Sequence, residues 1–192
     1  MFDTLKNWLG LGNEDREPLA RHSAVQRAVR AVEADVGKSI PHQLISRTRE
    51  QLGGVLGRFS RAGGQNRVEV NRDVLSDTAE TFKTIYHELL HAFGLMDEGT
   101  VEGLTQLAAV RHGIQDRVQA VAYPDRVRAF NKIAELVSPG VQNARDRFSR
   151  MLKWAQGNEF TRQTQTSVAL RKKGHSSSDA QTKAEQLLEA IR

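Results

Sequence analysis

The segment His87–His91 constrains this chain more than any other, because it carries the pattern H-E-x-x-H in helical surroundings. Asp77 and Glu80 are spaced as a capping box at the start of a helix, and Gly94 is a typical stop beyond its end. Apolar residues between these limits recur at steps of three and four, which predicts one buried helix face. They are Phe82, Ile85, Tyr86, Leu89, Leu90 and Phe93.

The spacing of the two histidines predicts a metal site. His87 and His91 are separated by four residues, so on a helix their rings lie one above the other on the same side. Two neutral imidazoles in that arrangement can bind one zinc ion. Glu88 would lie near the metal without binding it, where it can accept a proton from a zinc-bound water. The alternative is a pair of histidines that serve only the packing of a partly buried helix.

A catalytic zinc also needs a third protein ligand and one open position. Three carboxylates compete for that role: Asp97, Glu98 and Glu102. Asp97 would bind from a loop, Glu98 begins the next expected helix, and Glu102 lies one turn into it. A chain reversal within 94–99 would bring Glu102 opposite His91, so Glu102 is the predicted ligand. Asp97 and Glu98 are then expected as helix-start carboxylates or as partners that orient a histidine, and they remain the alternatives.

The H-E-x-x-H helix followed by Glu102-Gly103-Leu104-Thr105 resembles the gluzincin metallopeptidases over about residues 53–110. The resemblance implies a zinc site of His87, His91 and Glu102, with Glu88 as the catalytic carboxylate. It also implies a downstream tyrosine or histidine that steadies the oxyanion, for which Tyr123 and His112 are the candidates. The chain departs from the family at Gln106, where many relatives have a second glutamate. Its gap between His91 and Glu102 is also shorter than in most gluzincins.

A β-hairpin is predicted before the helix. Val55–Phe59 and Arg67–Val70 read as strands around a loop with two glycines, and Gly53, Gly54 and Gly57 suggest a bulge or a close approach of the backbone. In the zincins that this chain resembles, an edge strand runs beside the active helix and pairs with the substrate. Either predicted strand is a candidate for that role.

The overall prediction is an α+β fold that is mostly helical: a minimal zincin-like metallopeptidase domain. A small β-hairpin or sheet would pack on the active-site helix, and a helical part would follow. A helix from Leu19 to Val36 is expected to end at Gly37, and further helices are expected to begin at Pro124 and near Val141. We assign 1–18 to an N-terminal segment or linker, 19–156 to the domain, and 157–192 to a flexible linker with a final amphipathic helix.

Composition narrows the chemistry. The chain has no cysteine, so any zinc must be bound by histidine and carboxylate. Its net charge of +5 can attract nucleic acid, but no recognition motif accompanies it. No stretch approaches the roughly 20 apolar residues of a membrane span. The first ten residues lack the pattern of a secretory signal, which suggests a cytoplasmic protein or one delivered by a non-classical route.

These observations predict a zinc-dependent peptidase with Zn2+ as cofactor and a peptide or protein as substrate. By analogy of fold alone, it would suit a bacterial or phage enzyme. The first alternative is a zincin fold that binds a partner without catalysis. The second is a basic helical protein that binds nucleic acid.

Overall fold

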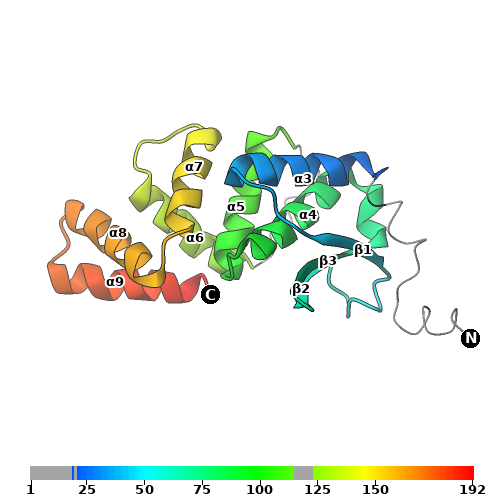
Figure 1. The fold of residues 1–192 in the computed structure, drawn as a ribbon. Coiled ribbons are helices and arrows are strands. Elements are labelled where there is room, and N and C mark those ends of the chain that lie inside the picture. The colour runs from blue at the N-terminus through cyan, green and yellow to red at the C-terminus, as the bar shows by residue number, and fades with distance from the viewer. Residues whose placement is uncertain (1–18, 20, 115–122) are drawn as a thin grey trace, which may run out of the picture. The chain divides into compact units, whose positions relative to one another are not determined.

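The computed structural model of the chain describes residues 19, 21–114 and 123–192 (Figure 1). They form two compact units, which divide between Ala92 and Phe93. Helices dominate, and the strands form one three-stranded mixed sheet. The predicted α+β, mostly helical class is therefore confirmed. The predicted N-terminal segment 1–18 lies outside the described residues.

The first unit contains the sheet. Its strands are β1 (Gln43–Arg47), β2 (Gly57–Ala62) and β3 (Gln65–Asn71), in the spatial order β1-β3-β2. β2 and β3 pair antiparallel as the predicted hairpin, whereas β1 runs parallel to β3. The turn at Gly63 and Gly64 has φ values of +59° and +78°, a conformation that glycine adopts without steric cost.

The sheet order corrects one prediction. Arg67–Val70 lies in β3, the central strand, because β3 pairs with both β1 and β2. It is therefore not an edge strand, and neither of its sides is open to pair with a peptide. The other candidate, Val55–Phe59, is a strand only from Gly57 onward, and β2 does lie at an edge.

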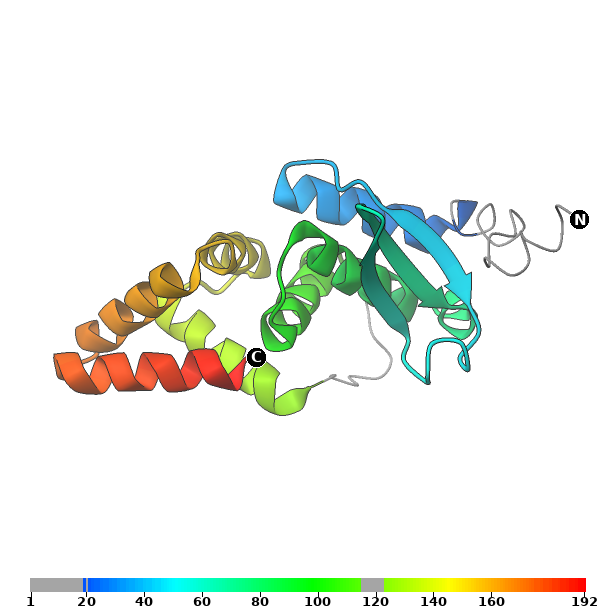
Figure 2. The ribbon, with the colours of Figure 1, turned by 60° about the horizontal axis from the view of Figure 1, so that its bottom comes forward.

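The described residues of this unit also form helices. Helix α3 (Ser23–Val36) ends at Gly37, which has a φ of +72°, as its pattern predicts. A 3-10 helix, η2 (Arg72–Ser76), leads into α4 (Thr78–Phe93). The hydroxyl of Tyr86 on α4 donates a hydrogen bond to Asp35 on α3 at 2.7 Å. Figures 1 and 2 show α3 and the sheet beside α4.

In the second unit the described residues form helices and the loops between them. The helices are α5 (Glu98–Arg111), α6 (Pro124–Val137), α7 (Ala144–Ala155), α8 (Glu159–Lys172) and α9 (Ser177–Ala190). Gly103 allows α5 and α6 to approach closely, because a Cβ atom there would lie 2.2 Å from Phe130 Cδ1. Apolar side chains from α5, α6 and α7 form its buried core: Val101, Leu104, Ala108, Phe130, Ile133, Phe148, Met151 and Trp154.

The predicted flexible linker at the start of 157–192 is wrong, because most of it forms α8. The side chain of Asn158 caps this helix by accepting a hydrogen bond from the Thr161 amide at 2.8 Å. Leu170 then packs with Ala180 and Ala184 of α9. The polar composition of this segment did not indicate a helix, because α8 buries only Thr166 and Leu170. The predicted domain limits stay a prediction.

No helix among the described residues is both long and apolar enough to cross a lipid bilayer.

Glu33 offers a test of how α3 is joined to the following turn. Its Oε1 accepts hydrogen bonds from the Ile40 amide at 3.0 Å and the Ser39 hydroxyl at 2.8 Å. The bond from the Ile40 amide, followed by that from Ser39, lowers the pKa of the Glu33 carboxyl below its ordinary value of 4.5. Folding therefore favours the ionised carboxylate. Its contribution to the free energy of unfolding is present above pH 4.5 and is lost as the pH falls through the lower pKa of the folded state.

We therefore expect Glu33→Gln to reduce the free energy of unfolding at pH 7 by up to about 1 kcal/mol. The amide can still accept hydrogen bonds but lacks the charge that strengthens them. Urea unfolding of both proteins at pH 7 and pH 3 measures the effect. The difference in free energy of unfolding between the two proteins should be smaller at pH 3 than at pH 7. An equal difference at both pH values would contradict a stabilising role of the ionised Glu33 carboxylate.

Candidate metal centre

The helix that carries the H-E-x-x-H pattern begins with a side-chain cap. Asp77 Oδ1 accepts hydrogen bonds from the amides of Ala79 at 2.8 Å and Glu80 at 3.0 Å. The reciprocal half of the predicted capping box is not made by Glu80, because the Asp77 amide donates to the Val74 carbonyl of η2. The N-terminus of α4 is therefore held by Asp77 and by the preceding 3-10 turn.

The predicted apolar face of α4 is buried. Five of its six residues, Phe82, Ile85, Tyr86, Leu89 and Leu90, have no exposed surface. The helix ends at Phe93, and Gly94 follows with a φ of +115°, as predicted. Since these side chains fix the rotation of α4 about its axis, they also fix the direction in which the two histidines point.

The histidine rings converge as the spacing predicts. The Nε2 atoms of His87 and His91 are 3.2 Å apart, and the rings meet edge to face with centroids separated by 4.9 Å. Two nitrogens bound to tetrahedral zinc at about 2.0–2.1 Å would be about 3.3 Å apart. The pair therefore matches the geometry of a zinc site with little movement of either ring.

The sheet holds His91 in place. The Phe59 ring of β2 stacks on the His91 ring at a centroid distance of 6.4 Å and an interplanar angle of 15°. His91 is 8% exposed, whereas His87 is only partly buried. This contact to Phe59 was not foreseen from the sequence, although Phe59 belongs to a predicted strand that was expected to run beside the helix.

Glu88 is buried against the first residue of the same strand. A Cβ atom at Gly57 would lie 2.8 Å from Glu88 Oε1 and 2.7 Å from Thr84 Cγ2. The backbone of Gly57 is not in the left-handed region, so the glycine is needed for space and not for its conformation. The close backbone approach suggested by the glycines of this segment is confirmed at Gly57, and it brings β2 directly onto Glu88.

The structure adds a carboxylate to the histidine pair. Ligand atoms of His87, His91 and Glu98 all lie within 4.8 Å of one another, and these residues form a group that could hold a metal ion. Imidazole nitrogen and carboxylate oxygen are donors that zinc accepts. Glu98 is the first residue of α5. From the sequence alone, this residue is an alternative third ligand.

The other two candidate carboxylates have different surroundings. The Glu102 carboxylate accepts a hydrogen bond from Gln106 at 3.2 Å and is not part of the group. Its assignment as a ligand stays a prediction. Asp97 occupies the N-cap position of α5, as expected for a helix-start carboxylate, but its side chain makes no capping bond. It forms an ion pair with Arg162 of α8 instead.

The two candidate oxyanion donors lie outside the group. Tyr123 precedes α6 with a φ of +53° and is 46% exposed, and its ring lies 5.0 Å from the guanidinium of Arg126. His112 is the C-cap residue of α5. Neither belongs to the group of potential ligands, and their roles in catalysis stay predictions.

No protein family, curated protein or solved structure matches this chain. The likeness to gluzincins therefore rests on the residues of the motif alone.

The contact between Gly57 and Glu88 can be tested directly. We expect Gly57→Ala to lower the free energy of unfolding by about 1–3 kcal/mol, the range for an overpacked site, because Glu88 and Thr84 must move away. Adding Thr84→Ser removes the methyl group nearest the new Cβ atom, so the double variant should recover part of the loss. Urea unfolding of wild type, both single variants and the double variant measures it. A Gly57→Ala protein as stable as wild type would show that the close approach is absent.

Proposed function

We propose that this chain is a zinc-dependent peptidase in which His87 and His91 bind the metal and Glu88 acts as general base. One observation carries the proposal: two imidazole nitrogens 3.2 Å apart on one helix, with a buried carboxylate at the intervening motif position. The proximity of the Glu98 carboxylate supports Glu98 as the third ligand, with Glu102 as the alternative.

Each residue has a distinct role in this proposal. A zinc ion held by these residues would lower the pKa of a bound water to about 7 and would polarise the carbonyl of the substrate. Glu88 accepts the proton of the attacking water and passes it to the leaving amine. Phe59 holds the His91 ring, and Gly57 leaves space for the carboxylate of Glu88.

The position of β2 supports a peptide as substrate. β2 is an edge strand of the sheet formed by the described residues, and it touches α4 at Glu88 and at His91. Extended peptides commonly bind by adding a strand to such an edge. A peptide bound in this way would run along the residues that are proposed to act on it.

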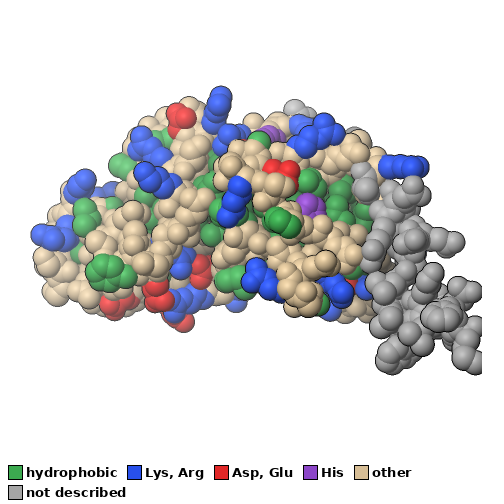
Figure 3. Space-filling view, in the orientation of Figure 1, with side chains coloured by type: hydrophobic (Ala, Val, Ile, Leu, Met, Phe, Trp, Pro, Cys, Tyr) green, Lys and Arg blue, Asp and Glu red, His purple; other side chains and the backbone are tan. Residues whose placement is uncertain are grey.

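The nucleic-acid alternative gains no support from α7, which carries four basic side chains: Arg145, Arg147, Arg150 and Lys153. Arg145, Arg150 and Lys153 are exposed, but the guanidinium of Arg147 donates to the Val141 carbonyl of the same unit. Figure 3 shows Lys and Arg side chains at several separate places on the visible face, as on an ordinary solvated surface. A metal-binding protein without catalytic activity is the alternative that needs an experiment.

The role of Glu88 distinguishes these alternatives. We expect Glu88→Gln to retain one equivalent of zinc and to lose peptide cleavage by about 10²–10⁴-fold, the contribution of a general acid–base group. Metal content by mass spectrometry and turnover of a fluorogenic peptide library provide the two readouts. His87→Ala is the control that should lose both zinc and cleavage.

Wild-type turnover in zinc-loaded Glu88→Gln would contradict the mechanism. A zinc-loaded wild type that cleaves no peptide would favour the non-catalytic alternative.

The identity of the third ligand can be measured separately. We expect Glu98→Gln to weaken zinc binding by more than about tenfold, because a charged ligand is lost. Glu102→Gln should change the dissociation constant by less than about threefold. Competition with a chromophoric chelator at fixed pH gives both values. The reverse order of effects would assign the third ligand to Glu102.

A further inference from the structure

The N-terminus of α5, where Glu98 lies, lacks the side-chain cap that helices commonly have. The first amides of a helix have no partner within it, and a Ser, Thr, Asp or Asn side chain at the N-cap commonly accepts from one of them. Asp97 is of the right type but makes no such bond. Residues from the end of the second unit hold this helix terminus instead.

A backbone carbonyl supplies the missing acceptor. The Gly99 amide donates to the Ile191 carbonyl, which immediately follows α9, at 2.9 Å. A Cβ atom at Gly99 would lie 2.8 Å from Arg126 Cβ and 2.9 Å from that carbonyl oxygen. Glycine is therefore needed at this position so that the chain after α9 can approach α5.

An ion pair holds Asp97, the residue that precedes Glu98. Arg162 of α8 contacts the Asp97 carboxylate at 2.5 Å, with only 12% and 18% of the two side chains exposed. The Arg162 guanidinium also lies over the Trp154 ring, 5.4 Å from its centroid. Trp154 is 1% exposed, so the ring against which Arg162 packs belongs to the buried core.

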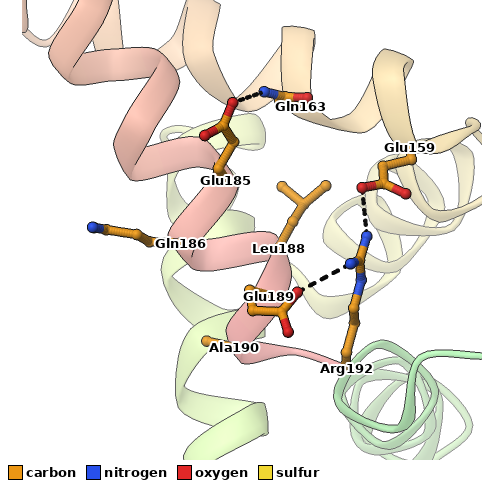
Figure 4. A pocket seen from close by; sticks show the side chains of 8 residues that line it. All are labelled: Glu159, Gln163, Glu185, Gln186, Leu188, Glu189, Ala190 and Arg192. Atoms are coloured by element: carbon orange, nitrogen blue, oxygen red, sulfur yellow. Dashed lines mark hydrogen bonds and ion pairs between the residues drawn. The ribbon is translucent and has the colours of Figure 1, made fainter.

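The segment that provides the Ile191 carbonyl is itself fixed. Ile191 is fully buried, and Arg192 forms ion pairs with Glu159 of α8 at 2.5 Å and Glu189 of α9 at 3.0 Å. Figure 4 shows these pairs at the pocket of about 520 Å³ that the residues of α8 and α9 line. Glu98 is thus flanked by Asp97 and Gly99, and both are bound by groups from the last part of the chain.

We propose that Arg162 and the Ile191 carbonyl are positioning groups for the metal site. By holding Asp97 and Gly99, they orient the first turn of α5 and with it the carboxylate of Glu98. Metal affinity then depends on the ion pair between Arg162 of α8 and Asp97 and on the hydrogen bond from Gly99 to the Ile191 carbonyl. The inference rests on the proposed function, because it takes Glu98 as the third ligand. A ligand that is held in place before binding loses less conformational freedom when the metal arrives.

The test compares zinc affinity in four substitutions of the full chain. Arg162→Gln and Asp97→Asn break the ion pair, Arg162→Lys keeps the charge but not the planar contact with Trp154, and Arg171→Gln is the matched control on the exposed end of α8. We expect the first two to weaken zinc binding by about tenfold, the lower end of what outer partners of a metal site contribute. The zinc affinity of Arg162→Lys should lie between that of these two variants and that of wild type. The zinc affinity of Arg171→Gln should stay within about twofold of wild type.

The double variant shows whether Arg162 and Asp97 act together. If Asp97 acts through Arg162, combining Asp97→Asn with Arg162→Gln weakens zinc binding no more than either change alone. If Asp97 is itself a ligand, Asp97→Asn has a much larger effect than Arg162→Gln, and that outcome overturns the inference.

Hydrogen exchange of the metal-free proteins gives a second readout. Amides of residues 98–101 should exchange faster in Arg162→Gln than in wild type or Arg171→Gln. If Arg162→Gln does not fold, Arg162→Lys supports both measurements.

The failures can be told apart. A wild type that binds no zinc, or a Glu98→Gln variant with unchanged zinc affinity, overturns the assignment of Glu98 and this inference with it. If Glu98→Gln weakens zinc binding while Arg162→Gln, or Arg162→Lys in its place, leaves it unchanged, only the positioning role is overturned.

Discussion

The burial of one face of α4 is the constraint on which the rest of the structure depends. Phe82, Ile85, Leu89 and Leu90 have no contact with solvent, and burying each such side chain contributes about 1.5–3 kcal/mol. Tyr86 joins them and binds Asp35 through its hydroxyl. Because these contacts fix the rotation of the helix, they give the histidines and Glu88 defined directions.

The site combines local and distant parts of the chain. The histidine pair follows from four-residue spacing on one helix, and its geometry would form wherever that helix forms. Glu88 and His91 also depend on β2, through the space at Gly57 and the stacked ring of Phe59. In the proposed arrangement Glu98 would also depend on α8 and on the chain after α9, which contact the residues on either side of it. Affinity for a metal would thus reflect packing well beyond the motif.

Sequence reasoning succeeded where a local rule determines the outcome. Gly37 and Gly94 end their helices in the left-handed conformation, Pro124 begins α6, and Asp77 caps α4. It failed at α8, because a helix with few buried residues has the composition of a linker when its partner is not known. It also took Arg67–Val70 as an edge-strand candidate, since neither strand order nor the pairing of β1 can be read from a hairpin pattern.

The sequence by itself determined the helix and the convergence of His87 and His91, because these follow from the period of an α-helix and the burial of its apolar face. Only the tertiary structure decided which carboxylate lies near the pair. Asp97, Glu98 and Glu102 fall within a few residues of one another, so their spacing alone cannot rank them. The contacts of Arg162 with Asp97 and of Ile191 with Gly99, which we propose orient Glu98, join parts of the chain that no local pattern relates.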